Sequence, residues 1–380
     1  MARKMNKVKI DLRSYPHYII MGVRKSGKTT LFRDLVLYNY HDASKGLLIS
    51  CGAEDGYRAL DDLQYEEART WDMIENEDGE RGLVQIVDEL LTLRGTDDQI
   101  EMVCFDTLDE LVDVATQQVY EEHRDAYMKY PKSLNDALGG YGAGQRRVAS
   151  LIKEQIGRLN NAGMAVFIIA HTKLKDKEDP LSGEKYEMIT NNLESRFYDP
   201  IADTAQMIVN IVIDRKIEGA GTVKKKVSKD KEIDVEIAGK QIEQQRYMYF
   251  RENNFVDAGG RFPGLPEKLP LSAENFMKAF ETGVKSSQSN PLTKTEEKKR
   301  KEEENEINQK AGVKLVAKEL EHKKAELSLE INNKLNANPD KEILSEVLAV
   351  IKENGIKGFD AENLKNVDVS ILEKIVNILN

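Results

Sequence analysis

The chain has little cysteine, and this excludes a fold held together by disulfides. Only two of its 380 residues are cysteines, Cys51 and Cys104, and each lies within an apolar stretch. A lone cysteine in such a setting acts as a small hydrophobic side chain. We therefore expect a protein of a reducing, cytoplasmic compartment.

Long apolar runs are also missing. No segment approaches the roughly 18 uninterrupted apolar residues of a transmembrane helix. The first residues are charged and lack the apolar core of a signal peptide. The sequence thus predicts a protein that neither spans a membrane nor carries a signal peptide.

A surplus of positive charge is absent as well, because the formal net charge is −10. This argues against a protein coated in basic surface. Contact with nucleic acid would need a local basic groove or loop inside an acidic whole.

What the sequence does contain is an alternation of short apolar runs with longer helical stretches. Runs that are apolar on both faces and are separated by helices indicate a mostly parallel sheet covered on both sides. Helices are predicted near 30–38, 82–93 and 146–160. From Met207 onward the sequence predicts mainly β-strands. The predicted strands are 18–21, 46–51, 102–106, 165–171, 207–213 and 245–250.

Composition divides the chain into three parts. Residues 1–285 hold nearly all the aromatic and strand-like segments and form the predicted α/β core, which a helix capped by Ser272 closes. Residues 286–338 form a charged, partly helical linker, and residues 339–380 form a small helical domain. Within the core, the charged segment 219–240 predicts an exposed hairpin or insertion.

One motif carries specific chemistry. Residues 22–29 match the phosphate-binding loop (P-loop) pattern G-x-x-x-x-G-K-T between a predicted strand and a predicted helix. Backbone amides of such a loop hold phosphate oxygens, aided by the dipole of the helix that follows. Lys28 would reach the β- and γ-phosphates, and Thr29 would bind Mg²⁺. The predicted nucleotide-binding residues are Gly22, Val23, Arg24, Lys25, Ser26, Gly27, Lys28, Thr29 and Thr30.

A second metal ligand is expected at the end of a buried strand. Asp106 ends the apolar run 102–106 and is the predicted Walker B acid. Thr107 follows it, whereas AAA+ machines carry their catalytic glutamate there, so this position weighs against an AAA+ machine. Asp109 and Glu110 fit the acidic first turn of a helix.

The general base must then come from another strand end, because ligands bind at the carboxyl ends of the strands in open α/β sheets. Glu54 is the preferred candidate and Asp55 the alternative, and either could be an ordinary loop acid. His171 is predicted to end the fourth strand, where it could sense the γ-phosphate, although a structural histidine is an equal alternative.

This order of elements resembles RecA-like phage P-loop ATPases, in particular the phage nucleotide-binding and single-strand-annealing group. The resemblance covers roughly residues 15–285 and includes Gly139-Gly140-Tyr141-Gly142-Ala143-Gly144, Tyr249-Phe250-Arg251 and Gly259-Gly260-Arg261-Phe262. It implies an ATP- and Mg²⁺-dependent protein, in the host cytoplasm if a phage encodes it. Such a protein binds single-stranded DNA in recombination or replication and assembles as a ring or filament.

In such assemblies a neighbouring subunit supplies a basic residue to the γ-phosphate. Arg261 and Arg251 are the matching candidates, with Arg261 preferred because it follows a Gly-Gly pair. DNA contact is expected from a long loop between the third and fourth strands. Its candidate residues are Arg124, Tyr127, Lys129, Tyr130, Lys132, Tyr141, Arg146 and Arg147, and the basic run Lys224-Lys225-Lys226 is the alternative surface.

Two other functions remain open on the sequence. One is a nucleotide-regulated scaffold with slow or absent hydrolysis. The other is an assembly ATPase that acts on a protein partner. The C-terminal helical domain would bind a replication or recombination protein, or another copy of the chain.

Overall fold

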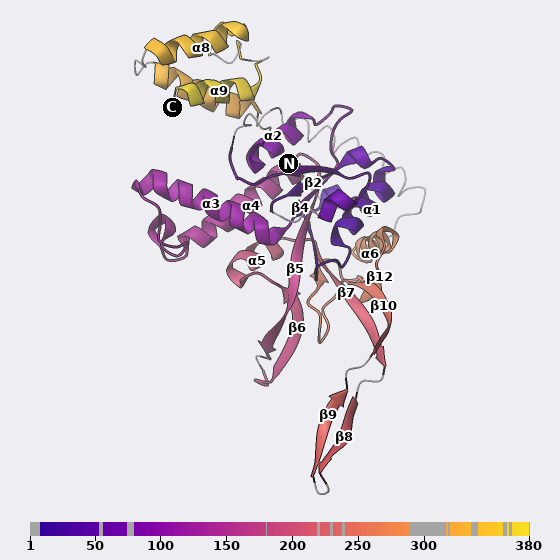
Figure 1. The fold of residues 1–380 in the computed structure, drawn as a ribbon. Helices are drawn as coiled ribbons and strands as arrows, with labels where there is room; N and C mark the ends of the chain where they lie inside the picture. Colours follow the sequence, from indigo (N-terminus) through magenta and orange to yellow (C-terminus); the bar gives the residue numbers. More distant parts are fainter. Residues whose placement is uncertain are drawn as a thin grey trace. The chain divides into compact units, whose positions relative to one another are not determined.

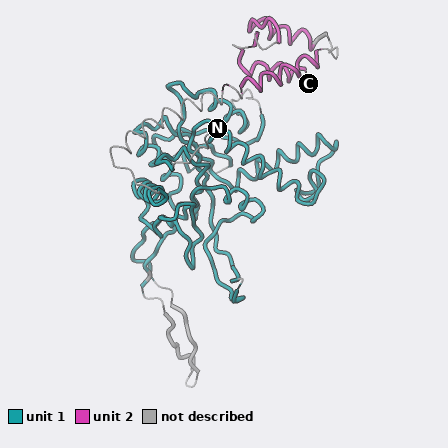
Figure 2. The backbone as a smooth tube through the Cα atoms, turned by 180° about the vertical axis from the view of Figure 1, so that it is seen from behind, with its two compact units in different colours: residues 1–306 teal, residues 307–380 magenta. Residues whose placement is uncertain are grey.

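The computed structural model describes residues 8–52, 56–73, 80–179, 181–218, 221–228, 231–237, 240–288, 317, 320–335, 341–359, 363–364 and 367–379. The chain divides into two compact units, residues 1–306 and residues 307–380 (Figure 2).

A mostly parallel sheet forms the centre of unit 1 (Figure 1). Its strands are β1 (Tyr18–Gly22), β2 (Gly46–Ser50), β3 (Gln64–Glu67), β4 (Met102–Asp106), β5 (Ala165–Glu178), β6 (Lys185–Asn191), β7 (Met207–Glu218), β10 (Lys240–Tyr249), β11 (Gly259–Gly260) and β12 (Lys268–Pro270). They run in the order β12-β10-β7-β1-β5-β4-β2-β3, while β11 pairs with β7 and β6 pairs with β5. Neighbours from β7 through β3 are parallel, and β6, β10, β11 and β12 pair antiparallel. The predicted α/β fold is confirmed.

Helices cover the two faces of this sheet (Figure 1). They are α1 (Lys28–Tyr40), α2 (Leu83–Thr92), α3 (Leu108–Tyr127), α4 (Ala143–Asn161), α5 (Ser195–Ala202) and α6 (Ala273–Ser286), with 3-10 turns η1 (Leu12–Ser14), η2 (Ala43–Lys45), η3 (Gly56–Ala59) and η4 (Ala137–Gly139). Phe32 of α1 and Phe276 of α6 share a core cluster with Tyr18 of β1 and Phe167 of β5. Helices α3 and α4 contact β5 from the other side. The predicted cap of α6 is confirmed, since the Ser272 hydroxyl accepts from the Asn275 amide at 3.1 Å.

Strand β5 is longer than predicted. The core sheet does end at His171, which pairs with Gly22 of β1, but the strand continues to Glu178. From Thr172 onward it pairs with β6, and the two strands form a hairpin that leaves the domain (Figure 1). Pairing with β6 gives hydrogen-bond partners to the backbone of this polar extension. The strand can therefore continue without an apolar pattern. Because β6 and β3 lack an apolar run, neither was predicted.

The predicted helix 146–160 is confirmed as α4, but the loop before it is shorter than predicted, because residues 108–127 form α3. Helices α3 and α4 form an antiparallel pair joined by residues 128–142 (Figure 1). The signal for α3 was present in the sequence, because Leu108, Leu111, Ala115 and Val119 recur at helical spacing and are all buried. Thr107 caps the helix by accepting from the Glu110 amide.

The charged segment after β7 is a β-hairpin of β8 (Gly221–Ser228) and β9 (Lys231–Ile237), as predicted. Unit 2 contains a helical segment at 320–335, α8 (Lys341–Glu353) and α9 (Val369–Ile378). Its small core includes Ile331, Val347, Leu372 and Ile375. Among the described helices, none combines the length and the apolar character needed to cross a membrane.

Unit 1 should lose stability in mild acid because of a buried histidine. His17 is bonded through Nε2 to the carbonyl of Ile201 at 3.0 Å. Burial lowers its pKa from 6.5 to about 4; the bond to Ile201 opposes this, whereas Arg261 and Lys153 lower the pKa further. The unfolded chain therefore binds more protons between these pH values. We expect the free energy of unfolding to fall by about 2 kcal/mol between pH ~7.5 and ~5.

Urea unfolding of the full chain at several pH values checks this expectation. His17→Gln should flatten the dependence in that window, because glutamine does not titrate. An unchanged slope in the variant would assign the acid sensitivity to other groups.

Candidate nucleotide-binding site

The P-loop connects β1 to α1, and its two glycines are required by its geometry. A Cβ atom at Gly22 would lie 2.7 Å from the Ser26 hydroxyl and 2.8 Å from the carbonyl oxygen of Ile211. Gly27 has a φ of +100°, in the left-handed region that favours glycine. The backbone can therefore close tightly only with glycine at both positions.

The first turn of α1 is open toward a ligand. Gly27 is the N-cap of α1, and no side chain caps the helix. The first amides of a helix lack intrahelical partners and point outward, where they attract anions. The Ser26 hydroxyl is also buried without a hydrogen-bond partner among the described atoms. This cradle fits phosphate oxygens.

The Lys28 ammonium lies inside the loop. It donates to the carbonyl oxygens of Gly22 and Val23, each at 3.1 Å. The side chain is buried, so its charge acts where solvent screening is weak. Lys28 is thus positioned to pair with phosphate charge entering the loop.

Thr29 and Asp106 come together as the sequence predicted. The Thr29 hydroxyl donates to Oδ2 of Asp106 at 3.0 Å, across 77 residues of sequence. A hydroxyl and a carboxylate at this separation suit a hard cation such as Mg²⁺, which takes its other ligands from water and phosphate. In the described part of the chain no three His, Cys, Asp or Glu side chains form a metal-binding cluster.

These residues line a pocket of about 630 Å³, a size suited to a nucleotide. Apolar Leu60 and Leu271 contribute to its wall, which suits a nucleobase. Its lining is Arg24, Lys25, Ser26, Gly27, Lys28, Thr29, Thr30, Leu31, Asp34, Gly56, Leu60, Asp106, His171, Arg246, Leu271 and Ser272.

A family model described as an AAA domain matches residues 14–262, which is more than half of the chain. The chain belongs to this AAA-domain family. Membership indicates nucleotide binding and hydrolysis and supports the predicted P-loop NTPase. The AAA domain runs from η1 through β11, so the whole P-loop and Asp106 lie inside it. No curated protein matches the chain closely enough to count as a relative.

Thr107 follows Asp106 in this AAA domain and serves as the N-cap of α3. The general base is therefore not Thr107, the residue next to the predicted metal ligand Asp106. That the chain is not an AAA+ machine stays a prediction based on Thr107. Glu54 and Asp55, the predicted bases, lie outside the described residues, which resume at Gly56 in the pocket wall.

His171 lines the pocket, and Asp109 holds it. One carboxylate oxygen of Asp109 accepts from the His171 amide at 3.2 Å and lies 3.7 Å from Nδ1 of the ring. The other accepts from the side chain of Asn192 at 3.3 Å. Burial raises the pKa of Asp109, but hydrogen bonds from His171 outweigh it and the net pKa is lowered. His171 lies just before the paired part of the β5–β6 hairpin, and Asn192 lies just after it. The Asp109 carboxylate therefore links the two ends of the hairpin next to the pocket.

Arg251 and Arg261 do not line the pocket of their own chain. Both are exposed, and Arg261 donates to the carbonyl oxygen of Asp203. The Gly-Gly pair before Arg261 forms strand β11, which pairs with β7. Arg246 of β10 lines the pocket together with Arg24, Lys25 and Lys28. It was not predicted, because nothing in the local sequence connects β10 to the P-loop.

The predicted DNA-contacting residues separate into two groups. Arg147 forms a double hydrogen bond with Glu122 at 2.8 and 2.7 Å, and Arg124 is paired with Glu121 and Asp125. Their charges are therefore neutralised within α3 and α4. Tyr141, by contrast, is 98% exposed, and Arg146 beside it has no carboxylate partner among the described residues.

Proposed function

We propose that this chain binds ATP with Mg²⁺ in its AAA domain, hydrolyses it, and acts on single-stranded DNA in phage recombination or replication. The RecA-like resemblance motivates the DNA part of this proposal. The observation that carries it is a basic pocket between α4 and α5.

The nucleotide part rests on the site geometry. Amides of the P-loop would hold the phosphate oxygens, with Lys28 balancing their charge. Thr29 and Asp106 would hold Mg²⁺, which neutralises charge on the phosphates when it is bound. His171, in the pocket wall, is positioned to contact the terminal phosphate or its attacking water.

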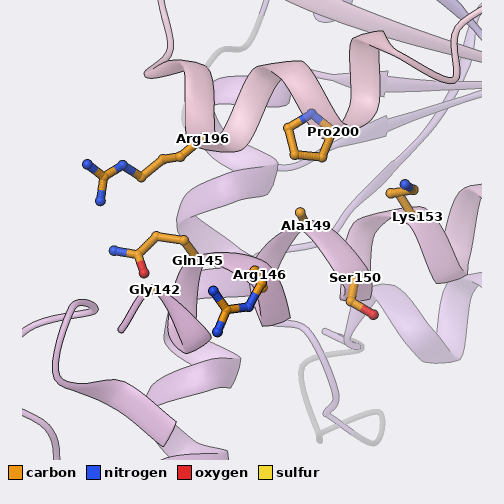
Figure 3. A pocket seen from close by; sticks show the side chains of 8 residues that line it. All are labelled: Gly142, Gln145, Arg146, Ala149, Ser150, Lys153, Arg196 and Pro200. Carbon is orange, nitrogen blue, oxygen red and sulfur yellow. The ribbon is translucent and has the colours of Figure 1, made fainter. Parts of the chain in front are cut away.

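The basic pocket has a volume of about 450 Å³ and is lined by cations without a carboxylate. Figure 3 shows the guanidinium groups of Arg146 and Arg196 with the amide of Gln145 between them, and Lys153 farther along α4. Gln145 is 6% exposed, and its Oε1 has no partner among the described atoms. Arg196 also forms a salt bridge with Glu194 at 3.2 Å. Both side chains are exposed, so this pair offsets little of the positive charge of Arg196. Such a surface suits phosphodiester groups.

The β5–β6 hairpin adds a second basic surface next to this pocket. Lys173, Lys175 and Lys177 alternate along β5, so they share one face of the hairpin. Burial and the charges of Lys173 and Lys177 lower the pKa of Lys175, which indicates that the three amines repel one another. Lys175 donates to the carbonyl oxygen of Leu193 at 2.8 Å, just before α5. Exposed Tyr141 offers a ring on which a base can stack.

The proposal includes assembly as a ring or filament in which a neighbour supplies an arginine to the phosphates. Arg251 is exposed, and the described chain gives its side chain no hydrogen bond. Arg261 already donates to Asp203. The contacts therefore favour Arg251 as the arginine offered to a neighbour.

The DNA proposal predicts a defined salt effect. Arg146→Gln combined with Arg196→Gln should weaken binding of a fluorescent oligothymidylate in the presence of ATP and Mg²⁺. For single strands, log K falls with log salt by about 0.7 per phosphate contact, so two lost contacts reduce the slope by about 1.4. Fluorescence anisotropy across a salt series measures both effects.

The matched control removes two exposed cations that lie outside both pockets, Arg215→Gln and Lys278→Gln. This control variant should leave the slope of log K against log salt nearly unchanged. If the control and the pocket variant lose the same affinity for DNA, the loss reflects the total charge of the protein and not the pocket, and the pocket proposal fails. If the wild type does not bind DNA and DNA does not change its ATP turnover, an assembly ATPase acting on protein becomes the better account.

A further inference from the structure

Arg246 reaches the nucleotide pocket from the side opposite to the metal-binding acid. The P-loop follows β1, and Asp106 ends β4, two strands away through β5. Arg246 lies on β10, two strands away in the other direction through β7. Both residues line the same pocket, so they flank the phosphate loop.

The guanidinium of Arg246 lies over the tip of the loop. One of its Nη atoms donates to the carbonyl oxygen of Lys25 at 3.4 Å. Its backbone is fixed, since its carbonyl oxygen accepts from the Leu271 amide at 3.0 Å. A guanidinium has five N–H donors, and this is the one hydrogen bond that the side chain makes to the described residues. Most of its donors therefore face the pocket or solvent.

Among the described residues that line the pocket, cations outnumber carboxylates. Arg24, Lys25 and Lys28 line the same pocket. Of the two carboxylates in the lining, Asp34 is paired with Arg33 at 2.7 Å and Asp106 accepts from Thr29. A fourth cation in this position lowers the free energy of the protein only when negative charge enters the pocket.

We infer that Arg246 is a phosphate-binding residue of the nucleotide site, supplied by the same chain that supplies the P-loop. It pairs with phosphate oxygens on the side that the Thr29–Asp106 pair does not reach. This role is separate from that of Arg251 or Arg261, which would act on a neighbouring subunit. The inference rests on the proposed nucleotide binding and deepens it.

The test is direct binding of a fluorescent ATP analogue with Mg²⁺ to the full-length chain, which does not depend on turnover. Arg246→Gln should weaken binding about ten- to hundredfold, the loss expected for charge-assisted hydrogen bonds. Arg246→Lys should fall in between, because lysine keeps the charge but not the planar fork. Arg215→Gln, an exposed arginine on the adjacent strand β7, is the matched control and should bind like the wild type.

The dependence of binding on ionic strength distinguishes phosphate binding by Arg246 from a structural role in which Arg246 only stabilises the P-loop. If Arg246 pairs with phosphate, the difference in affinity for the ATP analogue between wild type and Arg246→Gln should become smaller as salt is raised from about 50 to about 500 mM. The reason is that salt screens the attraction between charges. A gap that does not change with salt would mean that the bond to the neutral Lys25 carbonyl matters instead, and would overturn the inference. Equal affinities for Arg246→Gln and Arg215→Gln would overturn it too. Absence of binding by the wild type would instead refute the proposed function.

Discussion

Lys28→Ala is expected to lower ATP turnover by at least about a hundredfold, the largest effect on activity that the site predicts. The ammonium lies within the loop, 3.1 Å from two of its carbonyl oxygens, in a buried position where charge is poorly screened. Steady-state release of phosphate, measured with and without single-stranded DNA, gives the rate.

A thermal melt of the same variant is the control for folding. Lys28→Ala should keep a cooperative transition, because the core around β1 and α1 does not depend on the ammonium. Asp106→Asn should also reduce turnover by weakening the magnesium site, and raised Mg²⁺ should partly restore it. If the lysine variant hydrolyses ATP at the wild-type rate, the pocket is not the hydrolytic site.

Glu101→Ala is expected to cause the largest loss of stability, about 3–5 kcal/mol in the free energy of unfolding. Glu101 lies between two buried arginines, with Arg13 at 2.7 Å and Arg94 at 3.6 Å. The three side chains are each at most 6% exposed. Removing the carboxylate leaves the buried Arg94 without a carboxylate partner among the described residues, while Arg13 keeps Asp11 at 2.9 Å. Urea unfolding followed by circular dichroism measures the change.

An exposed ion pair provides the comparison. Glu121 and Arg124 on α3 form a pair whose side chains are 42% and 44% exposed. Glu121→Ala should therefore cost less than about 1 kcal/mol. Similar losses for the two variants would show that the Glu101 cluster contributes no more than a surface pair.

Local sequence patterns predicted the elements that carry local signals. The strands ending at Gly22 and Asp106 were predicted within one residue, because each is an apolar run buried on both faces. The hairpin arm of β5 beyond His171 was not predicted, because a strand that leaves the sheet has no apolar pattern to read. The acidic first turn of α3 was predicted, but the helix continues to Tyr127, where basic and aromatic residues had indicated a loop.

The sequence by itself determined the P-loop. Gly22 through Thr29 are contiguous, and their conformation follows from backbone freedom at two glycines and from the strand and helix on either side. Only the tertiary structure decided what surrounds that loop. Thr29 meets Asp106 across 77 residues, and Arg246 reaches Lys25 across 221. These contacts depend on the order and register of the strands in the sheet. Hydrophobic periodicity indicates that a strand is buried, but it does not indicate which strand lies beside it.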